Sequence, residues 1–143
     1  VILLSSIVAM QGMPFLAVYS AAKAYILSFG EAFHYENLSR GLHVSVIAAG
    51  ATATPMLEID NPKTHKALSS FFVPVMTPEQ VVKGSLKAIL KNKAVYLPGL
   101  RNRFMVGFIG RKILSRKANI AFWASVFGRY HKTFILPLLG RGD

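Results

Sequence analysis

Short continuous apolar runs alternate along this chain with longer stretches that have helical spacing. Residues 1–4 are all apolar, which is typical of a parallel strand covered on both faces. Residues 16–39 contain no proline and suit one long helix, for which Gly41 is a C-cap candidate. Residues 42–48 form a second, β-branched run, so the two strands should be parallel with a right-handed crossover. The pattern predicts a βαβ unit.

A second helix and a third strand are predicted further along. Thr77 precedes a proline and stands three positions before Gln80, which is the spacing of a capping box, so a helix should run over residues 78–91. Residues 94–97 form a short strand that ends at a Pro-Gly pair. Residues 55–76 hold three prolines and predict an irregular excursion that covers a site. The chain is therefore predicted to be α/β, with three parallel strands and flanking helices.

Composition agrees with a globular chain. With 143 residues it can bury roughly two-thirds of its unfolded surface, and 52% hydrophobic against 16% charged residues excludes a self-repelling disordered chain. The absence of cysteine excludes a disulfide framework and a cysteine-ligated metal. The opening residues lack the basic flank and cleavage site of a signal peptide, so we interpret them as an interior strand of a longer, cytoplasmic protein. The four histidines lack metal-ligand spacing and are predicted to be packing or surface residues: His34, His43, His65 and His131.

The last third of the chain is strongly basic, within a net charge of +11. Its basic residues are Arg101, Arg103, Arg111, Lys112, Arg116, Lys117, Arg129, Lys132 and Arg141. Apolar clusters alternate with these charges, which predicts amphipathic helices, and no run reaches the roughly 20 apolar residues of a membrane span. We therefore divide the chain into an α/β part, residues 1–98, and a basic helical extension, residues 99–143.

The charge of residues 99–143 leaves several partners open. A solvated basic face, an acidic partner and an anionic membrane surface all fit a positive field. A nucleic acid is not favoured, because no stacking platform or recognition motif accompanies the charge. In the membrane alternative the extension is a non-catalytic peripheral module, whose aromatic residues insert shallowly: Phe104, Phe108, Phe122 and Trp123.

The pair most suggestive of chemistry is Tyr19 and Lys23. Of the five tyrosines only Tyr19 has lysine four positions later. Four residues make about one helical turn, so the ammonium lies on the same face as the phenol and favours its phenolate form. The alternative is a half-buried tyrosine beside a surface lysine, which the spacing alone does not exclude. The βαβ context favours the chemical interpretation.

The stretch from Ser5-Ser6 through Tyr19-Ser20-Ala21-Ala22-Lys23 to Gly50-Ala51-Thr52-Ala53-Thr54 resembles the short-chain dehydrogenases/reductases. The resemblance covers residues 1–98 and implies the C-terminal half of a Rossmann-type, doubly wound parallel sheet. It implies that Tyr19 is the general acid/base, that Lys23 assists it and binds the nicotinamide ribose, and that Ser6 binds the substrate oxygen. Ser6 is preferred over Ser5 because it has the family's usual distance to the tyrosine.

The resemblance also implies a cofactor loop after the second strand. Gly50, Thr52 and Thr54 would contact the nicotinamide end of NAD or NADP. Ala49 stands where the family usually has proline, which should loosen the loop, and an ordinary strand-to-loop turn is the alternative. The resemblance further implies a homo-oligomer interface on the helix of residues 16–39. Because glycine costs a helix roughly 1 kcal/mol relative to alanine, Gly30 marks either a close helix approach or a position that simply tolerates glycine.

The family's Gly-rich phosphate loop has no counterpart among these 143 residues and is expected upstream of Val1. The complete protein is therefore predicted to transfer hydride between NAD(P)(H) and a carbonyl compound or secondary alcohol. The apolar excursion and extension predict a hydrophobic substrate. This chain alone is predicted to be inactive.

Overall fold

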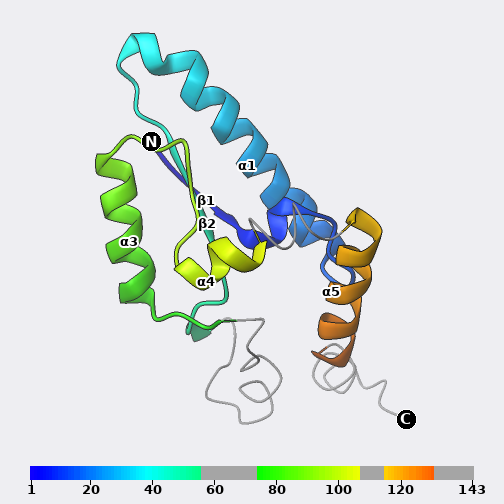
Figure 1. The fold of residues 1–143 in the computed structure, drawn as a ribbon. Helices are drawn as coiled ribbons and strands as arrows, with labels where there is room; N and C mark the ends of the chain where they lie inside the picture. Colours follow the sequence, from blue (N-terminus) through cyan, green and yellow to red (C-terminus); the bar gives the residue numbers. More distant parts are fainter. Residues whose placement is uncertain (56–73, 107–114, 131–143) are drawn as a thin grey trace.

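The structure is a computed structural model that describes three stretches of the chain: residues 1–55, 74–106 and 115–130. A parallel sheet in the order β1-β2-β3 lies at the centre, formed by β1 (Ile2–Ser6), β2 (Ser45–Ala49) and β3 (Val95–Tyr96) (Figure 1). The register pairs Ser6 with Ala49, so β1 and β2 end together. The predicted parallel sheet is confirmed, and the two serines expected to follow the first strand are its last two residues.

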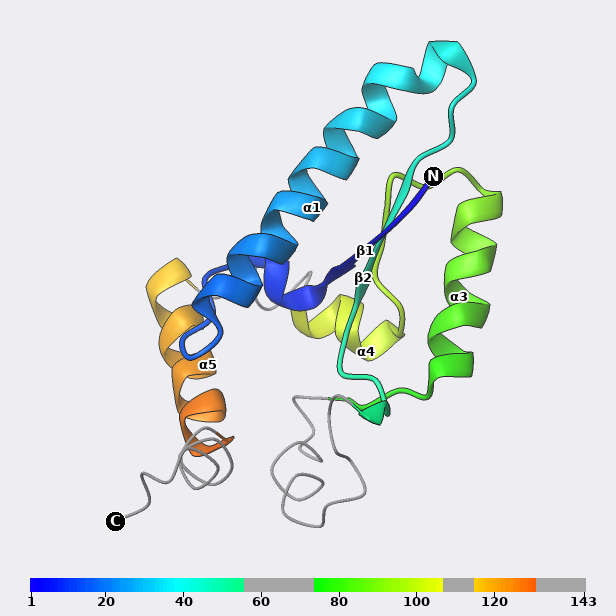
Figure 2. The same ribbon diagram turned by 180° about the vertical axis from the view of Figure 1, so that it is seen from behind.

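Two helices cover opposite faces of this sheet, as Figures 1 and 2 show from both sides: α1 (Ala17–Asn37) and α3 (Pro78–Leu90). Gly30 lies where α1 meets the sheet, because a Cβ at this position would overlap Val46 Cγ2 and lie 2.7 Å from Leu3 Cδ1. Gly30 therefore marks a close approach of its helix, but to the sheet and not to another helix among the described residues. Its missing side chain lets α1 lie close against β1 and β2.

The predicted signals at the helix ends are confirmed. α1 passes into the 3-10 turn η2 (Leu38–Arg40), and Gly41 ends it with φ 71°, donating its N–H to the Leu38 carbonyl. At the start of α3, Thr77 Oγ1 accepts the Gln80 N–H at 3.3 Å while Gln80 Oε1 accepts the Thr77 N–H at 3.0 Å. Both ends depend on bonds within a few residues, which a local sequence pattern can specify.

β1 is less covered than its apolar run predicted. Leu3 packs against α1, but on the other face Ile2 is 53% exposed and Leu4 is 66% exposed. The prediction of a strand covered on both faces is therefore wrong for the residues that the structure describes. The buried centre is β2 with its preceding residue, since Val44, Val46 and Ile47 are almost fully buried.

Two of the four histidines lie in the described part of the chain. His34 is buried, with Nδ1 2.6 Å from the Val44 carbonyl oxygen, and His43 is exposed. His65 and His131 lie outside the described residues. His34 therefore helps to hold α1 to the segment that leads into β2.

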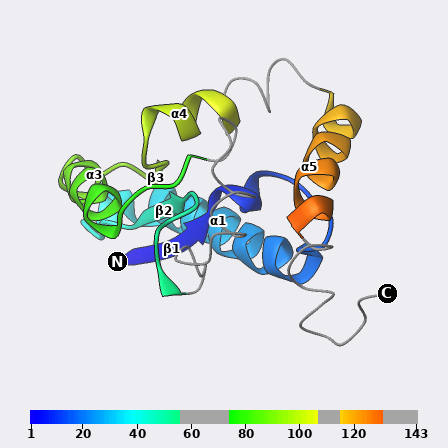
Figure 3. The same ribbon diagram turned by 90° about the horizontal axis from the view of Figure 1, so that it is seen from below.

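The chain beyond β3 stays at the carboxyl end of the sheet. It forms α4 (Leu100–Asn102), continues as a π-helical turn through residue 106, and later forms α5 (Arg116–Tyr130). Figure 3 shows α5 beyond the end of β1, next to η1 (Ile7–Met10). A helix in the extension is thereby confirmed, while the domain boundary at residue 98 remains a prediction. None of the described helices is both long and apolar enough to cross a membrane.

Most of the predicted excursion, residues 56–73, and Phe108 lie outside the described residues. Trp123 is only 7% exposed and clusters with Val8 and Met13. The prediction that its ring inserts into a membrane is therefore wrong for this conformation.

Candidate active site

A cleft of about 530 Å³ lies where β1 and β2 end. Its lining comes from the ends of both strands, the first turn of α1, α3, the segment around α4, and α5. Carboxyl ends of parallel strands are the usual place for ligands in open α/β sheets. Most lining side chains are apolar, and among the described residues that line the cleft only Tyr19 has an ionisable side chain.

Five of the six predicted site residues line this one cleft: Ser6, Tyr19, Gly50, Thr52 and Thr54. Lys23 does not line it, but its Nζ lies 5.7 Å from the centroid of the Tyr19 ring. The i, i+4 spacing on α1 therefore brings the two side chains together, as the helical interpretation requires. The sequence distance between Ser6 and Thr54 is closed by the parallel pairing of β1 with β2.

Tyr19 has a hydroxyl that is open to a ligand. The side chain is 41% exposed, and none of the described residues is a hydrogen-bond partner of its hydroxyl. It lies in the first turn of α1, which has no side-chain cap at its N-terminus. A ligand oxygen in the cleft can therefore reach this phenol without displacing a protein group.

Lys23 is held at the outer edge of β1. Its Nζ donates to the Leu4 carbonyl at 3.0 Å. The Ser45 N–H donates to the Val1 carbonyl, and successive carbonyls of a strand point to opposite sides, so the Leu4 carbonyl points away from β2. The ammonium thus lies at the sheet edge that has no partner strand among the described residues.

The two serines at the end of β1 use their hydroxyls differently. Ser5 Oγ donates to the Lys23 carbonyl at 2.7 Å, which commits its proton to α1. Ser6 Oγ accepts the Val8 N–H at 3.4 Å as the cap of η1, and among the described residues it donates to none. Ser6 therefore keeps a proton to donate to a ligand oxygen, whereas Ser5 does not.

The loop after β2 is tied to the chain before α3. Thr52 Oγ1 donates to the Gly50 carbonyl at 3.0 Å. The Ala53 N–H donates to the Met76 carbonyl at 2.9 Å, and the Met76 N–H donates to the Ala51 carbonyl at 3.0 Å. These bonds restrain the loop that directly follows Ala49, the residue expected to loosen it. No local sequence pattern revealed this restraint.

The chain is similar in sequence and in structure to known proteins of one family. The model for short chain dehydrogenases matches residues 1–65. A 7beta-hydroxysteroid dehydrogenase of Clostridium sardiniense is 33% identical over 102 residues, which is 71% of this chain and 37% of that protein. A solved structure described as giving insights into 7beta-hydroxysteroid dehydrogenase stereoselectivity superposes with a TM-score of 0.72 at 26% identity, over 86% of this chain and 46% of that one. The chain belongs to the short-chain dehydrogenase family.

The chain spans less than half the length of the relatives it matches. A second relative, the 3-oxoacyl-[acyl-carrier-protein] reductase FabG of Chlamydia muridarum, is 34% identical over 98 residues, or 67% of this chain and 39% of that protein. A very-long-chain 3-oxoacyl-CoA reductase of Mus musculus is 33% identical over 49% of this chain and 22% of that protein. The similarity thus extends to reductases with different names.

Asn102 also lines the cleft, and no sequence pattern pointed to it. It is 1% exposed and donates from Nδ2 to the Pro98 carbonyl at 3.0 Å. A Cβ on Gly50 would lie 2.5 Å from this Nδ2, so the carboxamide packs directly under the loop that follows β2. The place of Gly50 in the motif is visible in the sequence, but only the folded chain brings Asn102 beneath it.

Proposed function

We propose that the complete protein is an NAD(P)-dependent oxidoreductase that interconverts a carbonyl compound and a secondary alcohol. The observation that carries the proposal is that Ser6 and Tyr19 line one cleft, with Lys23 beside the tyrosine ring. The names of the matched relatives, which are dehydrogenases and reductases, support the same class of reaction.

The proposed cofactor, NAD or NADP, is expected to bind at the loop that follows β2. The loop of Gly50, Thr52 and Thr54 lines the cleft beside Tyr19 and fits the nicotinamide end of NAD or NADP. When bound, the nicotinamide supplies or accepts the hydride. A related Mycobacterium paratuberculosis short chain dehydrogenase, with a TM-score of 0.50 and 25% identity, was solved bound to NAD. The choice between NAD and NADP stays open.

Each catalytic side chain has a proposed task in the cleft. Ser6 donates a hydrogen bond from its hydroxyl to the substrate oxygen and orients the carbonyl, without giving up its proton. Tyr19 gives a proton to that oxygen during reduction and removes it during oxidation. Lys23 places its ammonium 5.7 Å from the centre of the Tyr19 ring, where it binds the nicotinamide ribose.

The proposed substrate is hydrophobic. The cleft is lined mainly by apolar side chains, and its volume of about 530 Å³ lies in the range of small-molecule sites. The matched relatives include proteins named for hydroxysteroids and for oxoacyl compounds. A substrate with a large apolar body fits both observations.

The decisive experiment replaces Tyr19 by Phe in the complete protein. We expect kcat to fall about a hundredfold or more, because acid–base catalysis is lost while the ring remains. Tyr25→Phe is the matched control, since Tyr25 lies two turns further along α1, is 70% exposed and does not line the cleft. Near-normal turnover by Tyr19→Phe would remove the proposal.

We further propose that the 143-residue chain alone does not catalyse the reaction. Its sequence contains no Gly-rich turn before a helix to hold the pyrophosphate of a dinucleotide. The purified chain should show no carbonyl reduction with NADH or NADPH. The measurement is the absorbance of the reduced nicotinamide, which should not decrease with time. Measurable reduction would contradict this.

A further inference from the structure

Helix α5 closes one end of the cleft with the indole of Trp123. The ring lines the cleft, is 7% exposed and forms a buried cluster with Val8 and Met13. This cluster packs against Leu16, one turn before Tyr19, and against Ala51 in the loop after β2. The indole therefore belongs to a wall that joins the tyrosine side of the cleft to the proposed cofactor side.

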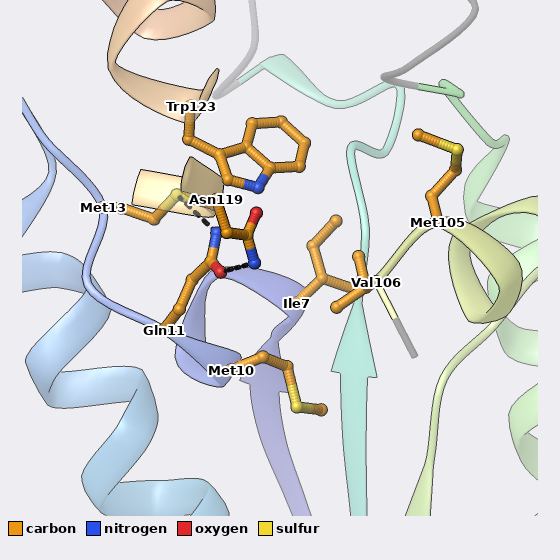
Figure 4. A pocket seen from close by; sticks show the side chains of 8 residues that line it. All are labelled: Ile7, Met10, Gln11, Met13, Met105, Val106, Asn119 and Trp123. Atoms are coloured by element: carbon orange, nitrogen blue, oxygen red, sulfur yellow. Dashed lines mark hydrogen bonds between the residues drawn. The ribbon is translucent and has the colours of Figure 1, made fainter. Parts of the chain in front are cut away.

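A pair of carboxamides holds α5 in this place, as Figure 4 shows. Asn119 Nδ2 donates to Gln11 Oε1, and both side chains border a small cavity of about 30 Å³ with Trp123. Asn119 is only 6% exposed and lies one helical turn before Trp123. Gln11 directly follows η1, the turn that Ser6 caps. One hydrogen bond thus ties α5 to the segment that begins at the proposed substrate-binding serine.

A residue that only filled the core would be enclosed on every side. Trp123 instead contributes to the surface of the cleft itself, next to the apolar residues Ile7, Val8 and Met13. The part of the indole that faces the cleft offers an apolar contact at this end of it, and only a ligand large enough to reach that end gains from the contact.

We propose that Trp123 is the specificity-determining wall of the cleft, which selects carbonyl substrates with a large apolar body, and that Asn119 is the positioning residue that holds it there. The inference rests on the proposed oxidoreductase function. It assigns to α5, in the basic extension, a part in substrate selection.

The test compares two ketones of different size in the complete protein with its nicotinamide cofactor. Trp123→Ala should lower the ratio of kcat/KM for trans-2-decalone over cyclohexanone about tenfold, mainly through the KM for decalone, because contacts of a few apolar groups have effects of this size. The ratio for Trp123→Phe should lie between those of the wild type and Trp123→Ala. Phe104→Ala is the matched control, since Phe104 is 57% exposed and does not line the cleft, and it should keep the wild-type ratio. An unchanged ratio in a folded Trp123→Ala protein would overturn the proposal.

A double variant tests the role of Asn119. If Asn119 acts through Trp123, Asn119→Ala lowers the same ratio, and Asn119→Ala combined with Trp123→Ala loses no more than Trp123→Ala alone. Losses that simply add would overturn the positioning role, because they would mean that Asn119 acts independently of the indole.

Fluorescence separates this inference from the proposed function. Trp123 is the one tryptophan among the 143 residues, and subtracting the spectrum of Trp123→Phe isolates its emission in the complete protein. Titration with trans-2-decalone should change that emission. A change without turnover would remove the oxidoreductase proposal and keep the wall, whereas normal turnover without a change would remove the wall alone.

Discussion

Two helical glycines have different neighbours where a Cβ would stand. At Gly30 of α1 the added carbon would overlap Val46 Cγ2 and approach Leu3, both in the sheet. At Gly84 of α3 it would meet mainly the Tyr96 hydroxyl at 2.7 Å, the far end of a side chain that can move. Substituting alanine in a helix gains about 1 kcal/mol of propensity, while overpacking a core costs roughly 1–3 kcal/mol.

Gly30→Ala should therefore be destabilising although alanine is the better helix former. We expect its free energy of unfolding to fall by about 1–2 kcal/mol, because the clash outweighs the propensity. Gly84→Ala, the matched control, should be neutral or stabilising. Urea denaturation followed by circular dichroism measures both, and equal stability of the two variants would show that α1 does not lie against the sheet as described.

Asn102 is expected to act through the loop above it. Asn102→Leu keeps the branched shape of the side chain but loses the bond to the Pro98 carbonyl, so the loop at Gly50 loses its support. In the complete protein, the KM for the nicotinamide cofactor should rise about tenfold, as expected for a lost buried hydrogen bond, and more than the KM for the ketone. Leu100→Ala, on the same short helix but 77% exposed, should change neither. An equal rise in both KM values would argue against a role through the loop.

Among individual residues, the sequence predicted those whose partners are close in the chain or fixed by a motif. Tyr19 and Lys23 are one helical turn apart, so their proximity follows from α1 alone. The choice of Ser6 over Ser5 remains a prediction, which the different uses of the two hydroxyls favour. Asn102 was missed because its partner Gly50 is far away in sequence and is reached only through the sheet.

Among the elements, α3 has an N-terminus that local chemistry defines. A hydrogen bond from the Thr77 side chain, and then one from its own backbone N–H, holds the pKa of the Glu79 carboxyl below its ordinary value. Because this folded-state pKa is lower than the unfolded one, the stability that Glu79 adds is present above the unfolded pKa and is lost as pH falls through the folded pKa.

The free energy of unfolding of wild type should therefore exceed that of Glu79→Gln above the ordinary glutamate pKa of about 4.3, and the difference should shrink as the pH falls below it. Denaturant titrations between neutral and acid pH measure this. In a Thr77→Val background the same comparison should lose most of its pH dependence, because the first cause of the shift is removed. An undiminished pH dependence there would mean that Thr77 is not that cause.

Elements with local signals were predicted better than elements placed by distant contacts. The cap of α3 and the glycine end of η2 were visible as short patterns and are confirmed. The position of α5 against η1 was not predicted, since it depends on Asn119 meeting Gln11, 108 residues away in the chain. The exposed face of β1 was missed because an apolar run does not say what covers it.

For the molecule as a whole, the outer face of α1 is unusually aromatic. Tyr25, Phe29 and Phe33 follow at one-turn intervals, with stacked rings whose centroids are 6.0 and 5.4 Å apart. Tyr25 is 70% exposed and Phe29 is 46% exposed. A different face of α1 is already used against the sheet at Gly30. An aromatic stripe open to water is costly unless another surface covers it.

We therefore propose that α1 pairs with another copy of the protein, which covers the stripe. Phe29→Glu puts a charge in the middle of that contact, where it would lose water without a partner, and should convert the oligomer to a monomer. Light scattering coupled to size exclusion measures the mass of the complete protein. Leu90→Glu is the matched control, because Leu90 is 86% exposed at the end of α3, on the other side of the sheet, and this variant should keep the wild-type mass. A wild-type protein that is already monomeric, or a Phe29→Glu variant that stays oligomeric, would show that the stripe is covered in some other way.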